Sequence, residues 1–193
     1  RIDDLPHDDD TVVIAVGPFS ADPYTRAERM DVNSGRRHNV ARAPLRNAGF
    51  ATDNHGTVRF AFGADIDRRE KLYYRTGDGA EWQLINDESV SHRTERPIGF
   101  SADDSIAYLQ VGQDRGPDAI VAYEVATGKR TQVLRDEVAD PERIIYRSGS
   151  SVPVGAFFEA GKPRTAFFDT TSPEARTYRS LGAAFGDPGG ITS

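Results

Sequence analysis

The feature that most constrains the fold of this chain is a motif order that returns about every 45 residues. Four segments, each the end of an apolar run that leads into a turn, start at Met30, Tyr74, Tyr123 and Phe168, with spacings of 44, 49 and 45 residues. A run of alternating polarity follows each turn, at residues 36–40, 81–85, 129–134 and 177–181. Each pair predicts a β-hairpin.

A second landmark precedes these hairpins. Phe50 opens FATDNHGTVRFAFG, Phe100 opens FSADDSIAYLQVG fifty residues later, and Tyr146 opens the looser YRSGSSVPVGAFFE. No window of eleven or more residues carries a helical apolar stripe, and the best candidate, residues 21–30, contains Pro23. The chain is therefore predicted to be all-β, with no helical layer.

Four strands in about 45 residues is the repeat from which a propeller blade is built. We expect a partial β-propeller of about four four-stranded antiparallel blades, forming one domain over residues 1–193 with blades at 1–45, 46–95, 96–140 and 141–193. A β-sandwich also has short strands and frequent turns, but it does not predict a near-constant period. In a strand, adjacent side chains point to opposite faces, so Trp82 and the pairs Tyr73/Tyr74, Phe157/Phe158 and Phe167/Phe168 are expected to pack between blades.

Charge and hydropathy exclude two classes of partner. The formal net charge is −6 and no short stretch is dominated by Lys or Arg, which argues against nucleic acid. The longest apolar runs, residues 12–16 and 119–123, are too short to span a membrane. There is no cysteine, so disulfides and thiolate sites are excluded, while periplasm and cytoplasm both stay open. Because the chain starts at Arg1 and its one methionine is Met30, we expect it to be a segment of a longer protein.

A search for chemistry predicts no catalytic residue and no cofactor in this chain. A nucleophilic serine of the α/β-hydrolase type needs G-x-S-x-G, which does not occur, and Ser101 and residues 148–151 are placed in turns with no histidine after them. The four histidines, His7, His38, His55 and His92, fall in loops or on polar strand edges, where exposed structural roles are expected. Neither common phosphate-binding glycine loop is present.

No metal site is predicted either. Asp3, Asp4, His7 and residues 8–10 lack the glycine turn of a Ca²⁺ loop and are interpreted as a solvated loop between blades. In GADIDRRE, the acidic Asp65, Asp67 and Glu70 can be neutralised locally by Arg68, Arg69 and the following Lys71, which predicts a hairpin loop with surface ion pairs. Residues that contact substrate stay unknown at this level.

Residues 99–111, GFSADDSIAYLQV, resemble the FSPDGK-x-lAf strand-turn-strand signature of propeller blades in the prolyl oligopeptidase family and in TolB-like periplasmic proteins. Residues 72–87, 116–136 and 153–169 extend the likeness over essentially the whole chain. The chain resembles the amino-terminal propeller of bacterial prolyl oligopeptidase-like serine peptidases, the group of dipeptidyl and acylaminoacyl peptidases. The resemblance rests on blade motifs and not on a catalytic signature.

What the resemblance implies is a non-catalytic segment that gates or recognises peptide substrates for a serine peptidase, whose carboxy-terminal α/β-hydrolase domain lies outside this chain. The alternative is a stand-alone TolB-like propeller that binds a protein or ligand. Two departures from the family limit how far this resemblance extends. Four blades form an open arc where relatives have seven or eight, so self-association through open faces is expected, and the acidic residues that hold a substrate's amino terminus in some relatives have no match here.

Overall fold

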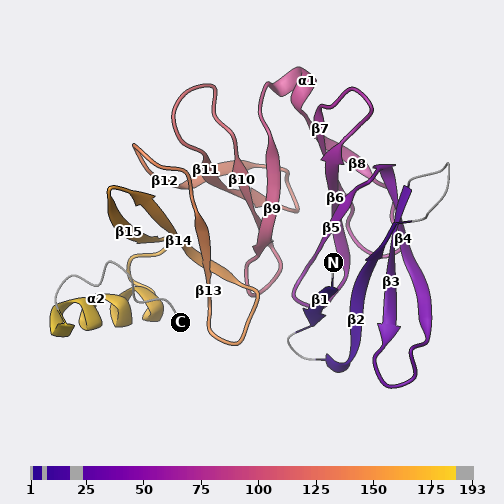
Figure 1. Ribbon diagram of the computed structural model, residues 1–193, viewed down its shortest axis with the longest axis horizontal. Coiled ribbons are helices and arrows are strands. Elements are labelled where there is room, and N and C mark those ends of the chain that lie inside the picture. Colours follow the sequence, from indigo (N-terminus) through magenta and orange to yellow (C-terminus); the bar gives the residue numbers. More distant parts are fainter. Residues whose placement is uncertain (1, 6–7, 18–23, 186–193) are drawn as a thin grey trace.

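Four antiparallel sheets lie side by side in chain order in the computed structural model, which describes residues 2–5, 8–17 and 24–185 (Figure 1). Each sheet is a meander in which strands that follow one another in sequence are neighbours. The strands of the first two sheets are β1 (Ile2–Leu5), β2 (Asp8–Val16), β3 (Tyr24–Asp31) and β4 (Arg37–Arg46), and then β5 (Gly49–Thr52), β6 (Val58–Ala64), β7 (Glu70–Tyr74) and β8 (Gln83–Asp87).

The third sheet again has four strands, whereas the fourth has three and is followed by a helix. The third sheet is β9 (Glu95–Phe100), β10 (Ile106–Val111), β11 (Ala119–Glu124) and β12 (Arg130–Arg135). The fourth is β13 (Arg143–Tyr146), β14 (Pro153–Ala160) and β15 (Lys162–Phe167). The helices are the one-turn α1 (Glu88–Ser91) and α2 (Pro173–Phe185), and no helix in this part of the chain is long and apolar enough to cross a membrane.

The cores show that the sheets are stacked in series. In β6, Phe60 belongs to the core shared with the third sheet, while its neighbour Ala61 belongs to the core shared with the first. In β11, Val121 faces the second sheet and Ile120 faces the fourth. A two-layer sandwich has one core between its two sheets, whereas here each inner sheet serves two cores. The predicted partial β-propeller is therefore confirmed.

The Tyr73/Tyr74 pair is divided between faces as predicted, whereas Phe157 and Phe167 line a groove with α2 and do not pack between sheets. Tyr74 and Phe158 are buried in sheet-to-sheet cores, while Tyr73 packs against the core between the first and second sheets. Trp82 joins that same core, and its indole N–H donates to the carbonyl of Arg42 over 2.9 Å.

The prediction of a strand at residues 177–181 is wrong, because these residues form the middle of α2. In the first three units the turn ends on Gly35, Gly79 and Gly128, whose φ values of +68°, +75° and +74° favour glycine. Pro173 takes that place in the fourth unit, and its ring fixes φ near −65°, so the hairpin turn cannot form. Instead Ser172 caps a helix, accepting the Ala175 N–H at 3.1 Å, and proline occupies its first position.

Two loop predictions have opposite outcomes. The acidic amino-terminal segment is not a loop: Asp3 and Asp4 lie in β1 and residues 8–10 in β2, while His7 lies outside the described residues. The β6–β7 loop does carry the predicted ion pairs, since Lys71 Nζ lies 3.1 Å from Asp65 and 3.9 Å from Asp67. The division into units at 1–45, 46–95, 96–140 and 141–193 stays a proposal.

Candidate functional site

The turns between the first two strands of the second, third and fourth sheets recur with the same backbone hydrogen-bonding pattern. Each turn is closed by one backbone hydrogen bond from its first residue: Asp53 to Thr57 at 3.0 Å, Ser101 to Ile106 at 2.8 Å and Arg147 to Val152 at 2.9 Å. These are the turns that follow the aromatic landmarks of the sequence. Each turn presents different side chains to the turn of the neighbouring sheet.

A polar clasp joins the turn of the second sheet to that of the third. The side-chain N–H₂ of Asn54 donates to Asp104 Oδ1 at 2.6 Å and to the Ser101 carbonyl at 2.7 Å, and His55 Nδ1 lies 2.8 Å from Asp104 Oδ2. Asp104 reaches its neighbours from a left-handed backbone with φ of 57°. That conformation is uncommon outside glycine but tolerated by Asp.

Asp53, His55 and Asp104 place potential ligand atoms within 4.8 Å of one another, a cluster that the sequence analysis missed because its members are far apart in the chain. Asp53 Oδ1 accepts the backbone N–H groups of His55 and Thr57, at 3.1 and 2.9 Å, and its Oδ2 accepts from Arg59 at 3.0 Å. The oxygens of Asp53 are thus already engaged, and the cluster acts as a structural clasp between two sheets.

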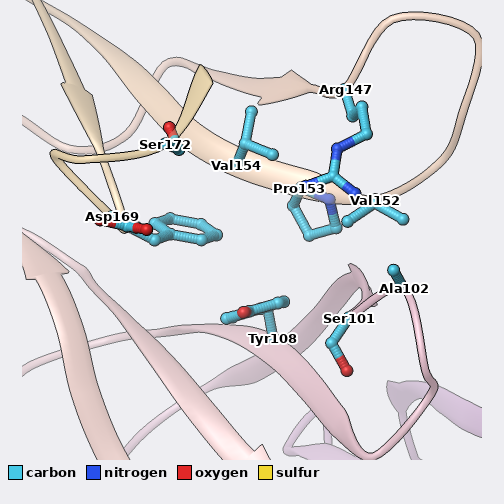
Figure 2. Close-up of a pocket in the computed structure, with 10 residues that line it drawn as sticks. Ser101, Ala102, Tyr108, Arg147, Val152, Pro153, Val154, Asp169 and Ser172 are labelled. Atoms are coloured by element: carbon cyan, nitrogen blue, oxygen red, sulfur yellow. The ribbon is translucent and has the colours of Figure 1, made fainter. Parts of the chain in front are cut away.

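A small pocket opens between the turns of the third and fourth sheets, where the clasp has no counterpart (Figure 2). Figure 2 shows Val152, Pro153 and Val154 along one side, with Tyr108, Ser101 and Ala102 opposite. Its volume is about 190 Å³. The full lining is Ser101, Ala102, Tyr108, Arg147, Val152, Pro153, Val154, Phe168, Asp169 and Ser172.

The walls of this pocket are held in place by close contacts. A Cβ added to Gly99, whose φ is +146°, would lie 2.9 Å from both the Ser151 carbonyl and Pro153 Cδ, so only glycine lets these sheets approach. The rings of Tyr108 and Phe168 pack with their centroids 4.8 Å apart. The pocket is therefore built on two rigid sheets.

Arg147 is the cationic group of the pocket. Its Nε donates to Glu174 Oε1 at 2.8 Å, and its side chain is 46% exposed. The backbone N–H of Glu174 and then the Arg147 guanidinium hold the pKa of the Glu174 carboxyl below its usual range. Burial, and next the nearby Asp103 carboxylate, raise the pKa of Tyr108, so its hydroxyl stays protonated. The pocket thus combines an apolar wall with hydroxyl and guanidinium donors and with the Asp169 carboxylate, whose pKa is lowered by the Thr171 hydroxyl and then by the Thr171 backbone N–H.

The hydroxyl of Ser101, the serine of the third-sheet turn, is engaged by groups of its own turn. The Ser101 hydroxyl donates to Asp103 at 2.6 Å and accepts the Ile106 N–H at 3.0 Å, so it caps its turn. His38, His55 and His92 are all exposed. The prediction of no catalytic residue, cofactor or metal in this chain stays a prediction.

Buried arginines at the sheet interfaces were not anticipated from the sequence. Arg75, with a side chain 4% exposed, donates to the Val58 carbonyl at 2.7 Å and pairs with Asp78 at 2.7 Å, while burial lowers its pKa. Arg59 packs over the rings of Tyr74 and Phe100, at 5.3 and 5.6 Å from their centroids. Burial alone would lower the Arg59 pKa, but hydrogen bonds to Tyr74 and Asp53 raise it. These arginines hydrogen-bond backbone carbonyls and contact aromatic rings at the sheet interfaces.

Comparison with known proteins shows similarity to a peptidase in sequence and to TolB in fold. No family model matches the chain. It is 31% identical over 115 residues to dipeptidyl aminopeptidase BIII from Pseudoxanthomonas mexicana, a match that spans 58% of this chain and 16% of the peptidase. The fold is similar to that of TolB from Acinetobacter baumannii, with a TM-score of 0.53 and 9% identity over 81% of this chain and 37% of TolB. A structure from a study of two prolyl endopeptidases has a TM-score of 0.45 and 11% identity over 69% of this chain and 21% of that one.

The similarity to the dipeptidyl aminopeptidase and the TolB-like fold confirm the predicted resemblance to a propeller of the prolyl oligopeptidase-like kind. The matched region is less than a fifth of the peptidase.

Proposed function

We propose that this chain is the non-catalytic propeller segment of a serine peptidase and that it gates or recognises peptide substrates for a hydrolase domain outside the chain. The observation that carries the proposal is the 31% identity to dipeptidyl aminopeptidase BIII over 115 residues. Stacked sheets with differing turns at one end give a rigid frame on which recognition residues can vary without loss of the cores.

The pocket beside Arg147 is the proposed recognition site. At about 190 Å³ it is smaller than the roughly 300–1,000 Å³ of drug-sized sites, so it suits a single side chain. Within the described residues the Arg147 guanidinium donates to Glu174 through Nε, which leaves its terminal N–H₂ groups available for a ligand. A guanidinium fork binds a carboxylate best, so an acidic side chain or a terminal carboxylate of a peptide is the proposed guest.

Hydrolysis assays on the isolated chain test the non-catalytic role. We expect no turnover of chromogenic dipeptide and acyl-amino-acid substrates, because the nucleophile is proposed to lie elsewhere. Turnover that survives stringent purification would contradict the proposal, and its loss in a Ser101→Ala, Ser151→Ala variant would place the nucleophile in this chain.

Steady-state kinetics of the polypeptide encoded by the whole reading frame test recognition. For peptides with an acidic residue, Arg147→Ala should raise KM about tenfold at unchanged kcat, the loss expected for a charge-assisted hydrogen bond. Arg147→Lys keeps the charge and should recover part of the effect. The matched control, Arg176→Ala, changes an exposed arginine of α2 that does not line the pocket.

The alternative function, a stand-alone TolB-like interaction module, predicts a different reading frame. A frame that encodes G-x-S-x-G with a later Asp and His supports the peptidase role. A frame that encodes only further blades would favour the interaction module.

A further inference from the structure

The pocket beside Arg147 contains a charge of the opposite sign. Asp169 lines it together with Arg147, and Figure 2 shows the two residues towards its two ends. Oδ1 of Asp169 accepts the Thr171 N–H and the Thr171 hydroxyl, both at 2.7 Å. Its Oδ2 accepts no hydrogen bond within the described residues, and the lowered pKa of Asp169 keeps the carboxylate charged at neutral pH. An anionic oxygen is therefore available to a guest.

Strand β14 holds the two charges apart. The Arg147 N–H donates to the Val152 carbonyl at 2.9 Å, and the Phe168 N–H donates to the Val154 carbonyl at 2.9 Å. Because Asp169 follows Phe168, Arg147 and Asp169 flank the start of β14 from its two sides. Neighbouring strands lie about 4.8 Å apart, so the backbones of these two residues are separated by roughly 10 Å.

The charges around the pocket disfavour a guest that carries a single charge. Arg147 pairs with Glu174 through Nε alone, and Arg176 lies near Asp169 but does not line the pocket and donates to the Thr171 carbonyl at 2.8 Å. A guest with a carboxylate alone would be attracted by Arg147 and repelled by Asp169. A guest with an ammonium group alone would meet the reverse. A guest with both charges is attracted at both ends.

The wall between the two charges is largely apolar. Figure 2 shows Pro153 and Val154 on one side of the pocket and Tyr108 on the other. The ring of Tyr108 packs on that of Phe168, with the centroids 4.8 Å apart. The Tyr108 hydroxyl has no hydrogen-bond partner in the described part of the chain, so it can bind a polar group in the middle of a guest.

We propose that this pocket binds a small zwitterion, a molecule that carries an ammonium group and a carboxylate at the two ends of a short apolar spacer. The terminal N–H₂ groups of Arg147 bind the carboxylate, and Oδ2 of Asp169 binds the ammonium group. The spacer lies against Pro153 and the Tyr108 ring. The inference refines the guest of the recognition site, so it rests on that part of the proposed function which makes this pocket a binding site.

The separation of the charges limits which zwitterions fit. An α-amino acid carries both charged groups on one carbon, so it cannot reach Arg147 and Asp169 together. A fully extended dipeptide spans at most about 7 Å, and the arginine side chain covers the rest of the distance between the backbones. Free dipeptides and ω-amino acids with a spacer of similar length, such as ε-aminocaproate, share the required chemistry.

Isothermal titration calorimetry with ε-aminocaproate tests the inference on the polypeptide encoded by the whole reading frame. We expect saturable binding that Asp169→Asn weakens about tenfold, because the amide keeps an oxygen for the Thr171 bonds but loses the charge. Arg147→Gln should weaken binding by a similar factor, which assigns the heat to this pocket. The matched control, Asp114→Asn, removes the charge of an exposed aspartate that does not line the pocket, and it should leave the affinity within about twofold. Equal affinities of Asp169→Asn and Asp114→Asn would overturn the proposal.

Singly charged analogues keep the test decisive if a variant fails to fold. Hexanoate and hexylamine are similar in length to ε-aminocaproate but carry one charge each, and both should bind the unaltered protein about tenfold more weakly. Hexanoate that binds as tightly as ε-aminocaproate, and that depends on Arg147, would overturn the zwitterion while the acidic guest of the proposed function would stand. If no ligand bound in a manner that depends on Arg147, both would fail.

Alanylalanine distinguishes the two sources of this chemistry. With any nucleophilic serine blocked by diisopropyl fluorophosphate, free alanylalanine should bind and its acetylated, amidated form should not, because blocking removes both charges. Tighter binding of free alanylalanine than of ε-aminocaproate would identify a short peptide as the guest, and the reverse order would identify an ω-amino acid. Equal binding of the free and blocked dipeptides would overturn the proposal.

Discussion

At the scale of single residues, Gly99 controls how closely the third and fourth sheets approach. Alanine at this position would carry a Cβ 2.9 Å from the Ser151 carbonyl, with a backbone φ of +146° that side chains rarely adopt. We expect Gly99→Ala to lower the free energy of unfolding by more than about 1 kcal/mol in urea titrations. Gly77→Ala is the matched control, because nothing lies within 4 Å of that Cβ position, and it should change stability by less than about 0.5 kcal/mol.

Asp103 gives the turn of the third sheet a dependence on pH. The hydroxyls of Ser101 and Ser105, followed by the Ser105 backbone N–H, lower the pKa of Asp103 from 3.8 to about 2. A carboxyl whose pKa is lower in the folded than in the unfolded state stabilises the fold above the unfolded pKa, and this contribution is lost as pH falls through the folded value.

We therefore expect the stability difference between the unaltered protein and Asp103→Asn to be largest near pH 6 and to shrink between about pH 4 and pH 2. Urea titrations at several pH values measure it. In NMR titrations, Ser105→Ala should raise the pKa of Asp103 towards its ordinary value. A pKa unchanged by that substitution would show that the hydroxyl does not act on the carboxylate.

At the scale of elements, α2 depends on its amino-terminal cap. Ser172 accepts the Ala175 N–H at 3.1 Å, and its carbonyl accepts the Arg176 N–H at 3.0 Å. Ser172→Ala should cost about 1 kcal/mol locally and speed amide exchange through the first turn of α2. Ser180→Ala, an exposed change inside the same helix, should leave exchange there unchanged or slower. Equal exchange in both variants would refute the cap.

The fourth unit also shows where prediction from the sequence succeeds and where it fails. Strands and turns of the first three units follow from alternation and from Gly35, Gly79 and Gly128, because both signals are local. Pro173, which stands in place of glycine after Ser172, is also a local signal, and it indicates a helix. The repeat pattern instead predicts a strand at residues 177–181, and this prediction is wrong. The sequence order S-P-E-A, a cap followed by proline at the first helical position, was the evidence for a helix.

The pocket and the clasp could not be predicted in the same way, because their residues meet only through the stacking of sheets. Arg147 and Glu174 are 27 residues apart, and Asn54 and Asp104 are 50 apart. No spacing rule connects such pairs. The turns that carry them were nevertheless marked in the sequence by Phe50, Phe100 and Tyr146, so the region was predictable although its contacts were not.

At the scale of the whole molecule, stacking in series makes the inner sheets the most protected. The second and third sheets are covered on both faces, whereas the first and fourth each have one sheet neighbour. Amide exchange measured by mass spectrometry should be slowest in β6, β7, β10 and β11 and faster in β14 and β15. Phe60→Ala leaves a cavity in the central core and should lower the free energy of unfolding by about 3–5 kcal/mol. It should therefore accelerate amide exchange in both inner sheets. Uniform exchange across all four sheets would contradict a serial stack.

The position of Trp82 has a spectroscopic consequence. It is the one tryptophan of the chain, and its indole sits at the boundary between the first two sheets, 6.4 Å from the Phe50 ring and 4.9 Å below the Arg75 guanidinium. Its emission therefore reports the opening of that one boundary. Events at the far end of the arc, around β15, will leave tryptophan emission unchanged unless they are transmitted through two intervening cores.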